Sequence, residues 1–209
     1  MKRKFLPFLF VLTFSGSPAM AIEEPAYEVL LETKHYEVRR YDPYIVAEVN
    51  VDDDFKRAGN SAFRILAGYI FGDNEPQQKM QMTAPVESRE GVRMKMTAPV
   101  ASQSMDGDGA FTYSFVMERK YTMETLPKPT NPGIRLVERP ERVMAVHRYS
   151  GTWSEKRYEE HEKLLLDALA TDRVETKGAP VFARYNAPFT PWFLRRNEIM
   201  IEIDWQNAE

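Results

Sequence analysis

The chain has 209 residues, of which none is cysteine and only three are histidine. Without cysteine it can form no disulfide, no thiolate ligand for zinc and no cysteine nucleophile. A chain of this length can be stable without such links, because it buries roughly 70% of the surface that its unfolded form exposes. The absence therefore excludes a disulfide scaffold and thiol redox chemistry.

Catalytic motifs are missing as well. The chain contains no G-x-S-x-G, no H-E-x-x-H and no glycine-rich phosphate loop. The run Glu159-Glu160-His161-Glu162 pairs acids with a histidine, but consecutive residues of a helix fan around its axis and do not converge on one ion. A Ser-His-Asp triad of distant residues stays open, since triads are recognised by geometry. The sequence favours a binding protein over an enzyme.

The first 21 residues have the pattern of a secretory signal peptide. Residues 2–4 are basic, residues 5–14 are apolar, and residues 19–21 read Ala-Met-Ala, which is typical of a cleavage site. The apolar run is much shorter than the ~20 residues that span a bilayer. We therefore expect a periplasmic or secreted protein that is cleaved after Ala21. A buried first strand or a retained anchor is the alternative.

The charge balance argues against two classes of partner. Residues 1–21 carry three of the 28 basic residues and none of the 31 acidic ones, so the cleaved chain would have a net charge of −6. Nucleic-acid binding needs a basic footprint for the phosphates. A negative chain is also repelled by an anionic membrane surface. We expect no nucleic-acid partner and no stable membrane insertion after cleavage; protein partners stay unknown.

Residues 44–72 predict a strand followed by a helix. Every second residue from 45 to 51 is apolar, which is typical of a strand with one buried face. Three aspartates at 52–54 suit the start of a helix and Gly72 suits its end, so we expect a helix over residues 55–71. At about 100° per residue, its apolar stripe contains Phe55, Ala58, Ala62, Ile65, Leu66 and Tyr69, with Phe63 and Ile70 beside the stripe.

The same pattern recurs 98 residues later. Two strand-like segments at 133–139 and 142–149 precede a helix over about 154–170, and Thr152-x-x-Glu155 suggests a capping box at its start. A repeated strand–strand–helix unit predicts an α+β structure with a pseudo-twofold duplication. Both halves would build one core. We therefore expect a single domain over residues 35–205, preceded by an arm at residues 22–34.

The most specific segments are Tyr36-Glu-Val-Arg-Arg-Tyr41, Lys79-Met-Gln-Met-Thr-Ala-Pro-Val86 with its near repeat at 94–100, Ala183-Arg-Tyr-Asn-Ala-Pro188 and Arg195-Arg-Asn-Glu198. Together they resemble the SOUL haem-binding protein family, and the doubled Met-Thr-Ala-Pro-Val resembles its bacterial branch. The resemblance implies a distorted antiparallel β-barrel with two flanking helices. It also implies binding of haem or a related tetrapyrrole, as carrier, buffer or scavenger. A sensor of other bulky apolar ligands, or a tetrapyrrole-modifying enzyme, is the alternative.

The resemblance also implies where the porphyrin would lie. It places the ligand against the first helix, where the matching residues are Phe63, Ala67 and Ile70. Phe63 and Ile70 are the residues that the helical stripe leaves outside the core, and such a patch often marks a binding surface. The alternative is that a loop at residues 188–193 covers them.

Three arginines are candidates for the haem propionates, because arginine forms bidentate bonds with carboxylates. They are Arg64, Arg195 and Arg196. Solvated arginines or surface ion pairs are the alternative for each one. The Arg-Arg-Asn-Glu motif could equally be a structural turn that ties a loop to the barrel.

Iron ligands are scarce, and His147, His161 and Tyr41 are weak candidates. His147 has the phase of Ala145, so we expect it to face the barrel interior, and His161 lies on the apolar stripe of the second helix. A buried histidine with a satisfied hydrogen bond is the usual case for both. Arg40 stands where some relatives carry histidine. We therefore expect no firmly ligated metal.

Four methionines suggest a soft copper site as a further alternative. They are Met80, Met82, Met94 and Met96, and they would cluster if residues 79–86 and 92–100 paired as a hairpin. Methionine is also a common packing residue. Whether the doubled segment adds function or lengthens two strands stays open.

Overall fold

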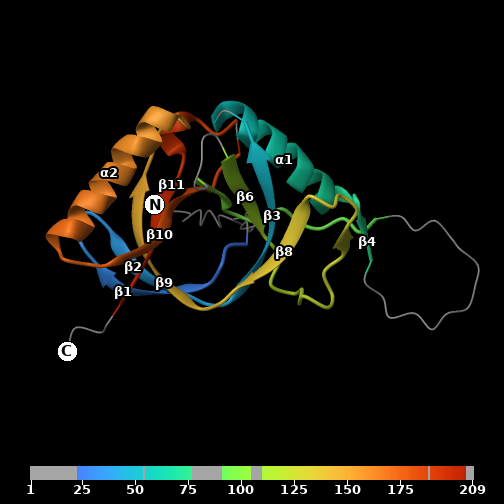
Figure 1. Ribbon diagram of the computed structural model, residues 1–209, viewed down its shortest axis with the longest axis horizontal. Helices are drawn as coiled ribbons and strands as arrows, with labels where there is room; N and C mark the ends of the chain where they lie inside the picture. Colours follow the sequence, from blue (N-terminus) through green and yellow to red (C-terminus); the bar gives the residue numbers. More distant parts are fainter. Residues whose placement is uncertain (1–22, 54, 77–90, 105–109, 188, 206–209) are drawn as a thin grey trace, which may run out of the picture.

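A computed structural model describes residues 23–53, 55–76, 91–104, 110–187 and 189–205 of the protein. Nine strands form one antiparallel sheet that curls into a half-barrel, and both helices pack on its outer side (Figure 1). In chain order the elements are β1 (Tyr27–Glu32), β2 (Glu37–Tyr41), β3 (Tyr44–Asp52), α1 (Phe55–Phe71), β4 (Asn74–Glu75), β5 (Val100–Ser104), β6 (Ala110–Val116), β7 (Lys128–Pro129), β8 (Ile134–Arg139), β9 (Arg142–Tyr149), α2 (Glu155–Thr171), β10 (Thr176–Arg184), the 3-10 turn η1 (Trp192–Leu194) and β11 (Asn197–Ile203). The predicted α+β fold, a distorted antiparallel barrel with two flanking helices, is confirmed.

Alternate residues of each strand face either the helices or the hollow of the half-barrel. On β9, Ala145 packs in the core beneath α2, whereas Met144 and Val146 belong to a separate cluster on the other face. On β3, Ala47 packs beneath α1 and Val46 lines the hollow. The period of two in the sequence thus separates an outer, helix-covered face from an inner face.

The strand order is β1-β2-β9-β11-β10-β5-β6-β3-β8. Without the edge strand β1, this order is symmetric about the β10–β5 pair, with β2 corresponding to β8, β9 to β3 and β11 to β6. Strand β2 of the early part pairs with β9, and β8 of the late part pairs with β3. Each half therefore contributes a strand beside the other half, so both share one sheet. The duplication itself stays a prediction.

Helix α1 has the predicted bounds, residues 55–71, and the positive φ of Gly72 (129°) ends it. The fully buried residues of its stripe are Ala58, Ala62, Leu66 and Tyr69. Ile70 is also buried, with 2% of its surface exposed, and packs in the same core. This corrects the expectation that Ile70 lies outside the core. The cause is Met94, which belongs to that core and whose N–H donates to the Ile70 carbonyl over 2.8 Å.

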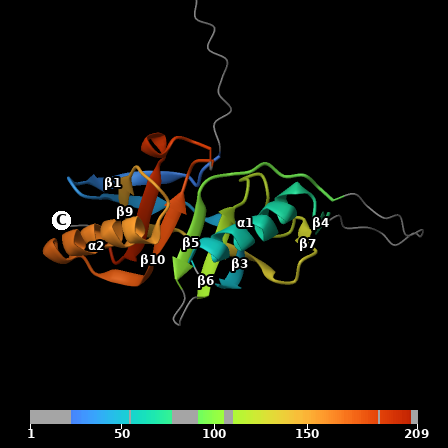
Figure 2. The same ribbon diagram turned by 90° about the horizontal axis from the view of Figure 1, so that it is seen from above.

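Residues 91–99 form no strand, so residues 92–99 do not supply a strand for the hairpin on which the copper alternative depends. They run beside α1 toward β5, and Figure 2 shows both helices on the same side of the sheet. Met94 is 5% exposed and Met96 is 36% exposed, so these two methionines do not share a face. The expectation that strand alternation puts Met94 and Met96 on one face is therefore wrong, whereas Met80 and Met82 lie outside the described residues.

Two further boundaries differ from the sequence-based expectation. Residues 27–32, expected to be part of an arm, form β1, which pairs with β2 at the edge of the sheet. The N-cap of α2 is Ser154, whose hydroxyl accepts from the Arg157 N–H, and not Thr152. A hydroxyl at the residue directly before the first helical turn reaches the free N–H groups there, and Thr152 lies too early to do so.

Candidate functional site

Phe63 is the exposed apolar residue of the predicted porphyrin patch on α1. Its ring is 40% exposed and meets Phe115 of β6 edge-on, with 5.6 Å between the ring centroids. Ala67, one turn further along, is only 8% exposed, and Ile70 is buried. The patch is therefore narrower than the sequence predicts, because Met94 packs against the C-terminal end of this helix.

Arg64 leaves α1 on the opposite flank from Phe63. It lines a shallow depression together with Asn131 and Pro132, next to the start of β8. Phe63 lies over β6, and β3 separates β6 from β8 in the sheet. The structure therefore does not bring Arg64 and Phe63 onto one surface, because adjacent residues of a helix point about 100° apart.

A different arginine lies near the Phe63 flank of α1. Gly59 precedes Phe63 by one helical turn, and a Cβ atom at Gly59 would lie 3.8 Å from Nη1 of Arg184. The Arg184 guanidinium also faces the ring of Trp153, 5.4 Å from its centroid. Burial lowers the pKa of Arg184 from its ordinary value, yet a guanidinium stays charged at any physiological pH. Sequence reasoning missed Arg184, because nothing in the order of residues shows which helix β10 approaches.

Arg195 shares the Trp153 ring with Arg184. The Arg195 guanidinium lies 4.2 Å from the Trp153 centroid, and its Nε donates to the Thr190 carbonyl over 2.8 Å. Arg195, which the sequence analysis selected, and Arg184, which it did not, are thus brought together at the Trp153 ring. Trp153 lies just before α2 and Arg184 lies near Gly59 of α1, so we call this place the seam between the two helices. This cluster carries positive charge beside aromatic surface.

Arg196, by contrast, is engaged in a buried ion-pair network. Its Nε donates to Glu198 over 2.9 Å and its Nη1 to Glu24 over 2.9 Å. Glu198 is fully buried and also accepts from Arg39 over 3.1 Å and from the Tyr185 hydroxyl over 2.7 Å. These contacts give Arg196 the structural role that the sequence left open as the alternative.

Tyr41 lies beside the same network. It is 3% exposed, and its hydroxyl accepts from Nη1 of Arg39 over 3.2 Å. Burial raises the pKa of Tyr41 well above that of a free tyrosine. The hydroxyl therefore keeps its proton at neutral pH, which disfavours Tyr41 as a phenolate ligand of iron.

His147 and His161 form a hydrogen-bonded pair between β9 and α2. His147 Nε2 lies 3.0 Å from His161 Nδ1, Arg157 Nη2 lies 3.4 Å from His161 Nε2, and His147 Nδ1 lies 2.7 Å from the His35 carbonyl. Arginine can only donate and a carbonyl can only accept. These constraints assign the direction of each bond: Arg157 donates to His161, His161 Nδ1–H to His147, and His147 Nδ1–H to the carbonyl.

This arrangement leaves no free lone pair on either imidazole, so iron ligation would have to break a bond. Burial lowers the pKa of His161 to about 4, and the neighbouring His147 and Arg157 act in the same direction. The Tyr149 ring stacks on His161 with 3.8 Å between centroids. His147 has the phase of Ala145, as predicted, but that phase faces α2 and not the barrel interior, because the concave face carries Met144 and Val146.

The loop that the sequence analysis considered only as a cover for the first helix carries apolar side chains that are themselves exposed. It consists of Phe189 (88% exposed), Trp192 (59%), Phe193 (58%) and Leu194 (64%) around η1. The Trp192 and Phe193 rings meet edge-on, 5.6 Å apart. Contiguous exposed apolar side chains of this kind often mark interaction sites.

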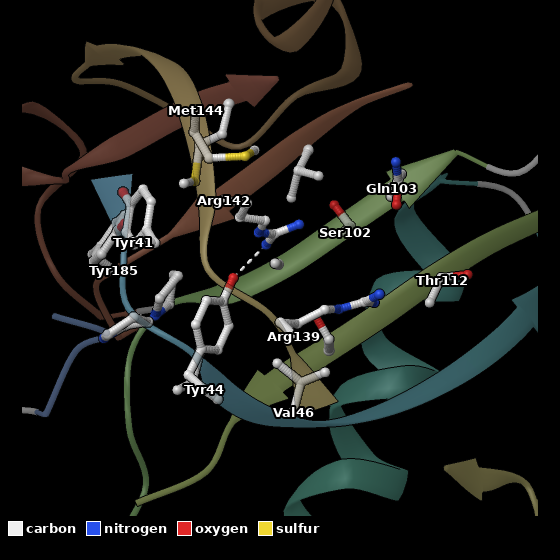
Figure 3. A pocket seen from close by; sticks show the side chains of 17 residues that line it. Tyr41, Tyr44, Val46, Ser102, Gln103, Thr112, Arg139, Arg142, Met144 and Tyr185 are labelled. Atoms are coloured by element: carbon white, nitrogen blue, oxygen red, sulfur yellow. Dashed lines mark hydrogen bonds between the residues drawn. The ribbon is translucent and has the colours of Figure 1, made fainter. Parts of the chain in front are cut away.

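The concave face of the sheet holds a hollow of about 70 Å³ (Figure 3). This is far below the ~300–1,000 Å³ of sites that enclose drug-sized ligands. Arg139, Arg142 and Tyr44 lie on one side of it, and Gln103 and Thr112 on the other. Figure 3 shows the guanidinium of Arg142 pointing into the hollow, where it donates a hydrogen bond to the Tyr44 hydroxyl.

Within the described residues, no group of three or more His, Asp or Glu side chains is placed to hold a metal ion. Among the same residues, no helix is long and apolar enough to cross a bilayer.

Comparison with known proteins supplies the decisive observation. The family model described as SOUL heme-binding protein matches residues 22–202, which include every helix and all but the last residue of the strands. The chain belongs to the SOUL heme-binding protein family. This SOUL-family chain is 25% identical over 200 residues to the mouse protein named Heme-binding protein 2, covering 90% of this chain and 93% of the mouse protein. The human protein of the same name is 26% identical over 197 residues, covering 86% and 89% of the two chains.

Solved structures share the fold of this SOUL-family chain at much lower identity. The EcmrR C-terminal domain superposes with a TM-score of 0.57 at 10% identity, covering 86% of this chain and 99% of that domain. A protein described as a hydrolase from Listeria innocua superposes with a TM-score of 0.53 at 12% identity, covering 84% and 94%. At such identities the likeness shows the fold alone.

Proposed function

We propose that the protein binds haem or a related tetrapyrrole, without turnover, as a carrier, buffer or scavenger. The observation that carries this proposal is membership of the SOUL heme-binding protein family over residues 22–202. The two mammalian relatives named Heme-binding protein 2 support it. Their coverage of about nine-tenths of the chain means that the whole domain, and not a short motif, is shared.

The residues at the seam between the helices fit a tetrapyrrole held by apolar contact. In this proposal the macrocycle lies on the exposed ring of Phe63, and its acidic side chains point toward Arg184 and Arg195. Exposed aromatic surface and partly desolvated guanidinium groups are the two features that such a ligand needs. The bound group would supply the iron and the conjugated ring. His147 and His161 would not ligate the iron, because their nitrogen atoms are already paired.

Apolar burial is large enough to support such a complex. Covering ~400 Å² of apolar ligand surface contributes about 10 kcal/mol before the costs of association. Those costs amount to at least ~4 kcal/mol. At most about 6 kcal/mol then remains, which corresponds to a dissociation constant of roughly 40 μM from apolar contact alone. A micromolar or tighter complex therefore also requires the contacts of the arginines with the acidic groups of the ligand.

An absorbance titration with ferric haem, and in parallel with metal-free protoporphyrin, tests the proposal. We expect saturable one-to-one binding of both ligands. Phe63→Asp should weaken binding by about tenfold or more, because it places a charge beneath the macrocycle. Leu164→Asp is the matched control, since Leu164 is an equally apolar residue of α2 that is 53% exposed.

A second pair of variants distinguishes the contribution of Arg195 to haem binding from that of Arg64. Arg195→Met should weaken haem binding by several fold, whereas Arg64→Met, on the opposite flank of α1, should leave it unchanged. No saturable binding of either porphyrin would refute the function. Equal losses in Phe63→Asp and Leu164→Asp would refute the site.

We also propose that the protein is exported and acts in the periplasm or outside the cell. The basic, apolar and Ala-Met-Ala segments of residues 1–21 support this proposal. N-terminal sequencing of the protein purified from its natural host should begin at Ile22. An unprocessed N-terminus in the cytoplasmic fraction would refute it.

A further inference from the structure

The hollow on the concave face lies on the opposite side of the sheet from Phe63, α1 and α2. It lies where the end of β2 pairs with the start of β9 and the start of β3 pairs with the end of β8. The register places Tyr41 opposite Arg142 and Tyr44 opposite Arg139. The turn after β2 and the turn after β8 thus bring two tyrosines and two arginines to one place. Residues distant in the sequence meet here only because each half of the chain contributes a strand to the other.

The charged side chains that line the hollow are all positive. Of the 17 residues that line it, Arg139 and Arg142 are the charged ones, and no carboxylate is among them. Arg139 donates to Glu48 over 2.7 Å, but Glu48 is shared with Arg135, whose Nη2 lies 2.9 Å from it. Two guanidinium groups therefore share a single carboxylate, and Arg142 adds a further positive charge that Glu48 does not pair with. The local excess of positive charge favours an anionic ligand.

Arg142 is the arginine of the hollow whose charge and hydrogen-bond donors are not fully paired. Its Nη2 donates to the Tyr44 hydroxyl, its Nε is buried, and this Nε has no hydrogen-bond partner among the described residues. Within that part of the chain Arg142 also forms no ion pair, unlike Arg139, Arg39 and Arg196. A buried donor without a partner is unfavourable, and a bound carboxylate would satisfy it by pairing with the guanidinium.

The remaining wall of the hollow is apolar. Val46, Val116, Met144, Val181 and Met200 line it beside the arginines. The hollow is partly open to solvent, and its volume of about 70 Å³ admits a carboxylate and the first carbon atoms of an apolar chain but not a macrocycle. We infer that the hollow is a second ligand site, which binds a small amphiphilic carboxylate through Arg142, with its apolar body against Val181 and Met144.

Calorimetric titration of the purified protein with sodium octanoate tests this site. Octanol and octylamine serve as matched probes with the same chain and a neutral or positive head. We expect saturable one-to-one binding of octanoate, at least about tenfold weaker binding of octanol, and no binding of octylamine. Equal binding of octanoate and octanol would show a non-specific apolar site and overturn the inference.

Variants assign the binding to this hollow. Arg142→Met should weaken octanoate binding by about tenfold or more. Arg135→Met, which removes the same charge from the same rim but not from the lining, should change it less than about twofold. Val181→Phe should block binding by filling the hollow without any change of charge, and serves if Arg142→Met does not fold. Unchanged octanoate affinity in Arg142→Met or in Val181→Phe would overturn the assignment.

One variant separates this site from the proposed haem site. Phe63→Asp lies on the other face of the sheet, so it should leave octanoate binding unchanged. Loss of octanoate binding in Phe63→Asp would mean that both ligands use one site and would refute a second one. Because the inference does not rest on haem binding, failure of either titration leaves the other interpretable.

Discussion

The imidazole rings of His147 and His161 are joined by a nitrogen-to-nitrogen hydrogen bond of 3.0 Å, which links β9 to α2. Such a bond requires one ring to present N–H and the other a lone pair. Arg157 on one side and the His35 carbonyl on the other determine which nitrogen carries each proton. A proton on His147 Nε2 would face the His161 Nδ1–H and break the link, whereas a proton on His161 Nε2 would face Arg157 and break that hydrogen bond.

We predict that the protein loses stability as the pH falls from about 6.5 to about 4. The unfolded chain takes up a proton on His161 at its ordinary pKa of 6.5, whereas the folded chain resists until about 4. The unfolded state therefore binds more protons in this window, and the stabilisation present above pH 6.5 is lost toward pH 4. Partial exposure reduces the effect to about 1–2 kcal/mol. Urea unfolding at a series of pH values measures it.

The variant His161→Gln isolates this effect from the carboxylates that titrate nearby. It should flatten the fall in unfolding free energy between these pH values, while His35→Gln, at an exposed position, should not. Identical pH dependence in the wild type and in His161→Gln would contradict the assignment.

Haem affinity should depend little on either histidine. His147→Ala and His161→Ala should change the dissociation constant for ferric haem by less than about threefold, because neither ring has a lone pair to offer. Metal-free protoporphyrin should bind with similar strength. The Soret absorbance during titration reports both results, and a loss of tenfold or more in either variant would show that the pair opens to ligate iron.

Removal of Glu198 should be among the most damaging single changes in the chain. Glu198→Ala would remove the fully buried carboxylate that Arg39 and Arg196 share, and would leave the buried Arg39, which is 2% exposed, with only the partly exposed Glu37 as a counter-charge. We expect a loss of about 3–5 kcal/mol in the free energy of unfolding. Glu28→Ala breaks the exposed pair with Arg40 and should cost at most about 1 kcal/mol. Equal midpoints of denaturant unfolding for the two variants would disprove the structural role of this network.

Two glycine substitutions should have opposite signs. A Cβ atom at Gly91 would lie 1.7 Å from the Gly72 carbonyl oxygen, so Gly91→Ala forces apart the residues after α1 and should cost about 1–3 kcal/mol. At Gly59, within α1, the added Cβ would make ordinary contact, 3.5 Å from the Tyr113 hydroxyl. Gly59→Ala should therefore stabilise the helix by about 0.5–1 kcal/mol. Thermal unfolding midpoints distinguish the two, and a stabilising Gly91→Ala would refute the close approach.

Much of the fold could be predicted from the sequence because it depends on local patterns. Helix α1 has its predicted bounds, since the signals for the start and end of a helix, such as the positive φ of Gly72, act within one turn of the chain. The alternation in β3 and β9 likewise identified strands with two different faces. The predictions that Ile70 lies outside the core and that residues 92–100 form a strand were wrong for the same reason. A helical wheel shows which residues share a face, but it cannot show that residues 91–99 pack against that face instead of forming a strand.

The candidate site was less predictable, because its members come from separate strands. Phe63 could be selected from the helix that carries it. Arg184 could not, because its nearness to α1 depends on where β10 lies in the sheet. Arg64 and Phe63 are neighbours in sequence and lie on opposite flanks of α1.

The sequence by itself determined the family, the elements and the alternation of their faces, since these follow from motifs and from residues a few positions apart. Only the tertiary structure decided which charges meet. The cross-pairing of β2 with β9 and of β3 with β8 places Tyr41 opposite Arg142 and Tyr44 opposite Arg139. It also decided that Arg196 stabilises the barrel and that Arg142 points into a hollow. Coulomb forces and hydrogen bonds act over a few ångströms in space, and the separation of residues along the chain does not report that distance.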